Sequence, residues 1–200
     1  MKKFLLFVTV VVLAFTVAQA QFDFGVKGGL TMARINLDLQ NNISADFQYG
    51  AHGAVFFNIG KGLLSFQPEV MFIQKGVHVN NMQNDDYAQY TLNYVDVPML
   101  ARATIGLGLV DIYFNFGGYG GYLLSSKQKI SIAEHLNGHS YEVTELNDWD
   151  AGIIIGAGVK VLSLIFELRY GQGLVNVSNN TENYQDSKNT YLNISLGVQF

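Results

Sequence analysis

A strict alternation of apolar and polar residues closes the chain, and this period of two constrains the fold more than any other feature of the sequence. Over the last ten residues the apolar face consists of Leu192, Ile194, Leu196, Val198 and Phe200. Only a β-strand places every second side chain on the same side. The same alternation recurs in segments that start near Phe22, Phe47, Leu63, Tyr90, Val110, Trp149, Leu164 and Thr190. We therefore predict eight strands.

The charged residues separate the two faces of these strands. Charged residues make up only 14% of the chain, against about 25% in typical globular domains, and the apolar faces carry none. The opposite faces carry Asp23, Lys27, Glu69, Lys75, Asp96, Arg102, Asp111, Asp150, Lys160, Glu167 and Arg169. A soluble exported barrel and a membrane barrel both produce this alternation, so the connections must decide between them.

Short and long connections alternate along the chain. The short ones are Asn58–Gly62, Ile105–Leu109 and Leu162–Ser163, and the long polar ones cover 36–46, 76–89, 125–148 and 175–189. Barrels of the outer membrane have this asymmetry, and about ten tilted residues suffice to span the membrane. The sequence therefore predicts an all-β fold, an eight-stranded antiparallel transmembrane β-barrel with short periplasmic turns and long extracellular loops.

Aromatic residues fall near both predicted membrane boundaries, as in the aromatic girdles of such barrels. Those at the predicted periplasmic ends are Phe22, Phe57 and Phe200, and those at the outer ends are Phe47, Tyr49, Phe72, Tyr122, Trp149 and Tyr170. Pro68 and Pro98 each lack a backbone donor inside a predicted strand, so we expect a bulge or a widened pairing at each.

Residues 1–20 read as a secretory signal peptide. Lys2 and Lys3 precede an apolar run from Phe4 to Ala18, and Ala18-Gln19-Ala20 fits a cleavage site. After Ala20 no apolar run is long enough for a membrane helix. We expect residues 21–200 to form the outer-membrane barrel domain.

Several classes of function are disfavoured. The chain has no cysteine, a net charge of -4 and no basic block, so we expect no thiolate site and no nucleic-acid partner. His135 and His139 are four residues apart, a spacing that suits a metal only on a helix, and Asn137 and Gly138 disfavour one. Ser125, Ser126, Glu134 and His135 share a loop without a catalytic motif. We expect no enzyme, no cofactor and no metal.

The interior of an eight-stranded barrel is just wide enough for its own side chains. We therefore expect a structural polar network in the lumen, formed by Glu69, Asp96, Arg102, Glu167 and Arg169. An ion path through these residues is the alternative, but charges buried together are normally paired and hydrogen-bonded. His52 is expected to be a further polar filler of the lumen.

Four segments resemble the PorT-like outer-membrane β-barrel family, often labelled porin-family proteins. They are Phe24–Leu30, Gln67–Gly76, Tyr94–Pro98 and Leu168–Leu174, and the C-terminal Phe200 is similar to the signal read by the barrel-assembly machinery. The resemblance implies an eight-stranded barrel in the outer membrane of a Gram-negative bacterium. Because the family's namesake assists type IX secretion, it also implies that role by analogy.

We therefore expect an integral outer-membrane barrel, not an enzyme, that acts as a surface-binding or structural protein. Aromatic and acidic residues of the long loops, such as Tyr87, Tyr141, Asp85 and Glu142, suit a recognition surface. The alternatives are a narrow porin for small solutes and an accessory component of type IX secretion. The expected partners are outer-membrane lipid, the barrel-assembly machinery during insertion and secretion-system proteins.

Overall fold

The computed structural model describes residues 22–36, 43–81, 87–132, 135–141, 146–177 and 187–200. Its strands are β1 (Phe22–Asn36), β2 (Ile43–Lys61), β3 (Leu64–Asn81), β4 (Tyr87–Gly106), β5 (Val110–Ile132), β6 (His135–Tyr141), β7 (Trp149–Val161), β8 (Leu164–Asn176) and β9 (Lys188–Gln199). Within these ranges no helix is long and apolar enough to cross a membrane. The predicted signal peptide lies outside the described residues.

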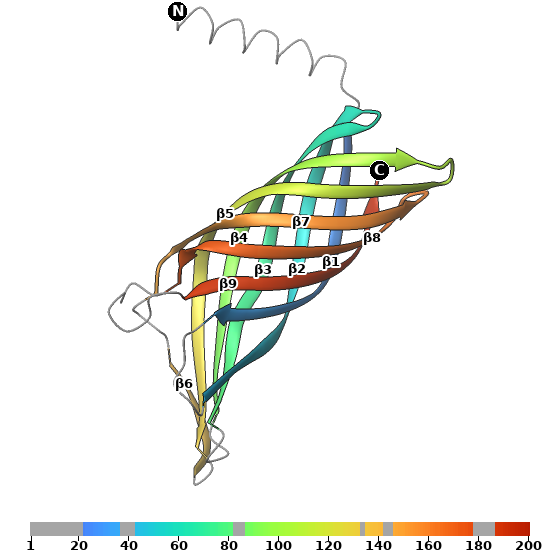
Figure 1. Cartoon of the computed structure of the whole chain (residues 1–200). Coiled ribbons are helices and arrows are strands. Elements are labelled where there is room, and N and C mark those ends of the chain that lie inside the picture. The colour runs from blue at the N-terminus through green and yellow to red at the C-terminus, as the bar shows by residue number, and fades with distance from the viewer. Residues whose placement is uncertain (1–21, 37–42, 82–86, 133–134, 142–145, 178–186) are drawn as a thin grey trace, which may run out of the picture.

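Eight of the strands close into a barrel (Figure 1). The ring runs β1–β2–β3–β4–β5–β7–β8–β9 and returns to β1, and all neighbouring strands are antiparallel. In the described part of the chain β6 pairs with β5 outside this ring. The predicted eight-stranded antiparallel barrel is therefore confirmed.

The strands β3, β4 and β5 are longer than the sequence suggested, at 18, 20 and 23 residues. The predicted loops 36–46, 76–89 and 125–148 are wrong in part, because β2 begins at Ile43, β3 continues to Asn81, β4 begins at Tyr87 and β6 pairs with the end of β5. These strand extensions are rich in polar residues, such as Gln128, Lys129 and Ser131 of β5. A high polar content weakens the apolar alternation by which strands are recognised.

The short turns join the predicted pairs of strands, β2 to β3, β4 to β5 and β7 to β8. Two of them are shorter than predicted, at 62–63 and 107–109, because β2 continues to Lys61 and β4 to Gly106. Gly62 and Gly108 adopt φ of 82° and 91° there, a conformation that costs glycine little. The start of β1 and the end of β9 meet at the same end of the barrel, where the rings of Phe24 and Phe200 stack with centroids 5.2 Å apart. We call this the short-turn end and the opposite one the long-loop end.

Neither proline causes a bulge, so that form of the prediction is wrong. The register stays constant past both, but the paired residues are interrupted beside them. Between β2 and β3 the partners pass from Phe56↔Glu69 to Ile59↔Phe66 around Pro68. Between β3 and β4 they pass from Pro68↔Met99 to Met71↔Asp96 around Pro98. The missing donor loosens the pairing locally without shifting it.

The outer wall of the barrel is apolar, and its end at the long-loop side is well marked. The predicted girdle residues are all exposed on this wall. A row of Phe72, Val95, Tyr122 and Trp149 crosses four strands. Above it, Gln74 donates to Asn93 and Asn93 donates to Ser125, at 3.1 and 2.9 Å. We call these three residues the polar ladder, and they mark the point where the wall meets water.

Glycines make room for the large side chains inside the barrel. Four buried aromatic rings lie directly opposite a glycine of a neighbouring strand, in the pairs Phe56–Gly25, Tyr113–Gly158, Tyr119–Gly152 and Tyr191–Gly171. A Cβ atom at any of these glycines would collide with the ring. These glycines thus make it possible for large side chains to fill a narrow lumen.

Candidate functional site

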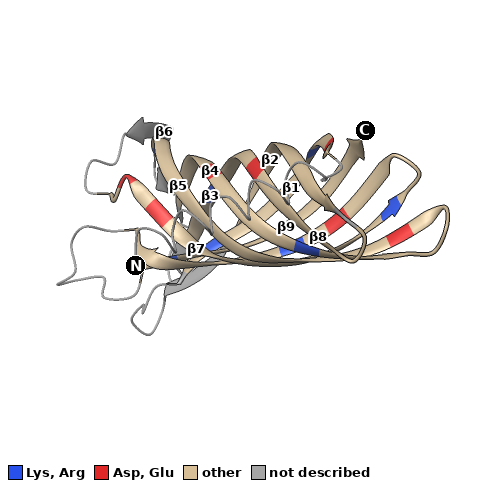
Figure 2. Ribbon diagram, turned by 90° about the horizontal axis from the view of Figure 1, so that it is seen from above, with Lys and Arg blue, Asp and Glu red and all other residues tan. Residues whose placement is uncertain are grey.

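A four-residue ion cluster crosses the lumen near its middle. Lys27 on β1 contacts Glu69 on β3 and Glu167 on β8, both at 2.9 Å. Arg169, also on β8, donates two hydrogen bonds to Glu69, at 2.7 and 2.5 Å. The four side chains are at most 2% exposed, and their two positive and two negative charges balance. Figure 2 shows such charged positions as short coloured segments on long tan strands.

Arg102 extends this cluster toward the short-turn end. Its guanidinium carbon lies 3.6 Å from the centroid of the Tyr113 ring, and its Nη1 donates to Gln67 at 2.9 Å. Gln67 in turn donates to Glu69. The planar guanidinium is therefore held both by an aromatic face and by an amide oxygen, as arginine allows.

A second charged layer, the lysine cage, lies closer to the long-loop end. The Lys75 ammonium contacts Asp96 at 2.8 Å and Asp150 at 2.9 Å, from β4 and β7. It also lies 4.4 to 5.1 Å from the ring centroids of Tyr94, Tyr119 and Tyr191. Lys75 and Asp96 are completely buried. This layer holds one ammonium and two carboxylates.

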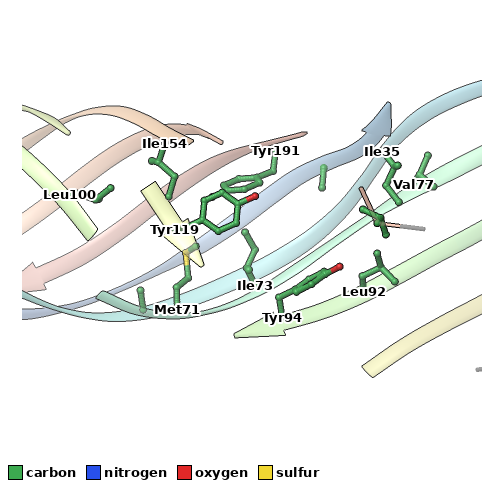
Figure 3. Close-up of a cluster of buried hydrophobic side chains, with 13 residues drawn as sticks. Ile35, Met71, Ile73, Val77, Leu92, Tyr94, Leu100, Tyr119, Ile154 and Tyr191 are labelled. Atoms are coloured by element: carbon green, nitrogen blue, oxygen red, sulfur yellow. The ribbon is translucent and has the colours of Figure 1, made fainter. Parts of the chain in front are cut away.

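Apolar and uncharged polar side chains occupy the remaining length of the lumen, and the apolar ones form a cluster (Figure 3). Met71, Ile73, Leu100 and Ile154 are at most 1% exposed. At the long-loop end the filling continues as an apolar cap of Ile35, Val77, Leu92 and Val177, against which Tyr90, Leu123 and Leu146 pack. Buried side chains thus occupy the interior from the short-turn end to the long-loop end.

All five predicted lumen residues point inward, but they belong to two groups. The structure brings Glu69, Glu167 and Arg169 together and joins Arg102 to them through Gln67. Asp96 lies apart from them, in the lysine cage. Each group contains members absent from the predicted network, namely Lys27, Lys75, Asp150 and the three cage tyrosines. Their inward position follows from the period of two, but their partners do not.

The histidines have separate places. His52 is buried in the lumen as predicted, between Thr31 at 3.1 Å and Ser195 at 2.7 Å. His135 and His139 lie in β6, and four residues of a strand span about 13 Å. Among the described residues no cluster of histidine and carboxylate side chains could hold a metal ion. Glu134 lies outside the described residues.

A closed antiparallel barrel with an apolar, ring-bordered outer wall and ion pairs in its interior defines the class of integral outer-membrane β-barrels. The comparison with protein families agrees. The chain belongs to the outer membrane protein beta-barrel domain family, whose model matches residues 17–179. This membership identifies the chain as a membrane barrel and not a soluble one. The location of the protein is therefore the outer membrane.

The solved structures that resemble the chain are bacterial outer-membrane and surface proteins. Ail, the attachment invasion locus protein of Yersinia pestis, solved with the heparin analogue sucrose octasulfate, is 13% identical, with 90% of this chain and 99% of that chain covered and a TM-score of 0.45. OprG from Pseudomonas aeruginosa is 11% identical, with 90% and 97% covered and a TM-score of 0.49. Neisserial surface protein A is 11% identical, with 88% and 97% covered and a TM-score of 0.46. No curated protein matches the chain, so the family assignment rests on the family model.

Proposed function

We propose that this protein is a non-conducting, non-enzymatic scaffold of the outer membrane that presents a recognition surface at its long-loop end. The observation that carries the proposal is the filled lumen. The ion cluster, the lysine cage and the apolar cap follow one another along the interior. A solute would have to displace side chains at each level.

Paired charges make a firm obstruction to solutes. A buried ion that loses its partner costs several kcal/mol, and the ion cluster contains contacts from three strands. Opening a path would separate Arg169 from Glu69 or Lys27 from Glu167. The same burial keeps these polar groups away from any substrate, which supports the non-enzymatic part of the proposal.

The recognition surface is suggested by the length of the strands. About ten tilted residues cross a membrane, whereas β4 and β5 have 20 and 23. The polar ladder marks where their apolar wall ends, so the rest of each strand extends into water. A sheet that extends beyond the membrane is a suitable base for binding loops.

An osmotic swelling assay tests the sealed lumen. Vesicles with the wild-type protein should swell in arabinose no faster than empty vesicles. The positive control is a variant with Arg169→Ala, Glu69→Ala, Lys75→Ala and Asp96→Ala together, refolded and checked for heat-resistant gel mobility. Swelling of wild-type vesicles would favour the small-solute porin and contradict the proposal.

Export and partners are separate parts of the proposal. Cleavage after Ala20, read from the mass of the mature protein, tests the signal peptide.

Stable co-purification with secretion components from detergent extracts would favour the accessory role in type IX secretion.

A further inference from the structure

Exposed leucines occupy all three short turns. Leu63 lies between β2 and β3, Leu107 and Leu109 between β4 and β5, and Leu162 between β7 and β8, each more than 60% exposed. Turns that face water are normally built from polar residues, glycine and proline. Leucines displayed in every short turn therefore indicate an environment other than water.

The turns form one continuous rim. The Thr104 amide donates to the Leu63 carbonyl at 2.8 Å, and the Leu162 amide donates to the Leu109 carbonyl at 3.1 Å. The Gln199 amide donates to the Ser163 carbonyl at 2.9 Å. These bonds link successive turns to the C-terminal strand. We call the exposed residues Leu63, Leu64, Leu107, Leu109, Leu162 and Leu164 the leucine rim.

Few charged residues adjoin the leucine rim, and Lys61, the last residue of β2 and the partner of Leu64, is one of them. Lys160 and Asp111, on the strands above it, contact each other at 2.9 Å and so neutralise one another. The rim also continues directly into the lipid-facing wall, since Phe66, Ile105 and Val161 beside it are exposed. No row of polar contacts comparable to the polar ladder separates wall and rim among the described residues. The apolar wall is thus followed by polar residues at the long-loop end and by leucines at the short-turn end.

The height of the apolar wall determines where the leucine rim lies relative to the membrane. β7 has 13 residues and begins with Trp149 beside the polar ladder. At about 3.3 Å per residue and a tilt near 45°, it rises roughly 30 Å. The apolar band of such barrels is about 25 Å tall. The turn after β7 therefore lies about 5 Å beyond the hydrocarbon core, in the headgroup region.

We infer that the leucine rim is embedded in the leaflet at the short-turn end, with its side chains among phospholipid acyl chains. Leucine side chains reach several ångströms from the backbone, so a turn at this depth can insert them into the core. Burying apolar surface in this way is favourable by about 25 cal/mol per Å². The rim thereby anchors one end of the barrel, and the polar ladder fixes the other.

The chain's one tryptophan allows a direct test by fluorescence depth measurement. In a Trp149→Phe background, tryptophan is placed in two turns by Leu107→Trp and Leu162→Trp, in separate variants. Phe114→Trp is the lipid reference, because Phe114 lies on the mid-wall and is 54% exposed. Lys127→Trp, on the exposed part of β5 beyond the polar ladder, is the solvent reference.

Each variant is refolded into phosphatidylcholine vesicles with or without bromine on the acyl chains. We expect both turn tryptophans to be quenched by brominated lipid at least half as strongly as Phe114→Trp, and to be protected from iodide. Turn tryptophans that behave like Lys127→Trp, quenched by iodide and not by bromine, would overturn the inference. The rim would then be a surface for a periplasmic protein.

Discussion

Arg169 and Glu69 form a two-pronged ion pair across the lumen, with nitrogen–oxygen distances of 2.7 and 2.5 Å. They are 100 residues apart in the chain, and their strands β8 and β3 are separated in the ring by β9, β1 and β2. The pair therefore ties opposite walls of the barrel together. Bidentate arginine–carboxylate contacts are among the strongest and most directional polar interactions in proteins.

Breaking this pair should destabilise the barrel. Because Arg169→Ala leaves Glu69 and Glu167 with Lys27 as their remaining cation in the cluster, we expect the free energy of unfolding to fall by about 3–5 kcal/mol. The measurement is urea unfolding from phospholipid vesicles. Lys160→Ala is the control, since its partly exposed pair with Asp111 should contribute about 1 kcal/mol or less. Equal losses in the two variants would contradict the role of the cluster.

The lysine cage should respond unequally to the loss of its charges. Lys75→Met leaves Asp96 and Asp150 buried without a cation, and we expect a loss of at least about 3 kcal/mol. Asp96→Asn leaves the pair of Lys75 and Asp150 intact, so its cost should be less than half of that. The same unfolding experiment measures both. If Asp96→Asn were the more damaging change, this layer would not hold one ammonium and two carboxylates as described.

The glycines opposite the buried rings should be intolerant of a single methyl group. A Cβ at Gly171 would overlap the Tyr191 ring, so Gly171→Ala should cost about 1–3 kcal/mol through overpacking. In a Tyr191→Leu background the same substitution should cost about 0.5 kcal/mol or less, which a double-mutant cycle measures. Gly53→Ala, where a Cβ meets nothing within 4 Å, is the matched control. The explanation fails if the cost of Gly171→Ala is the same in both backgrounds.

The sequence predicts the barrel itself well, because a half-buried strand leaves an unambiguous period of two. The starts of β1, β5, β7 and β8 at Phe22, Val110, Trp149 and Leu164 coincide with the predicted ones. The inward direction of Glu69 and Arg169 follows from the same pattern. Strand ends beyond the membrane, such as that of β5, carry a weaker signal, because the polar residues Ser125, Ser126, Lys127, Gln128 and Lys129 follow one another there.

The partners inside the lumen could not be predicted from the sequence. Whether Lys27 contacts Glu69 or Asp96 depends on the stagger of strands that are not neighbours in the ring. The alternation of apolar and polar residues gives no information about this stagger. The predicted network therefore places Asp96 with Glu69, whereas the structure pairs Asp96 with Lys75. The glycines opposite Tyr113 and Tyr191 are visible in the sequence, but only the register assigns each glycine to its ring.

Single-channel recording in a planar lipid bilayer tests the central claim, a sealed lumen, most directly. The wild-type barrel is recorded beside the Arg169→Ala variant, with insertion verified by heat-resistant mobility of the same preparation. Because the ion cluster, the lysine cage and the apolar cap fill the interior, we predict no current steps from the wild type. Reproducible wild-type steps whose size changes in Arg169→Ala would show an open path past the ion cluster and contradict the account.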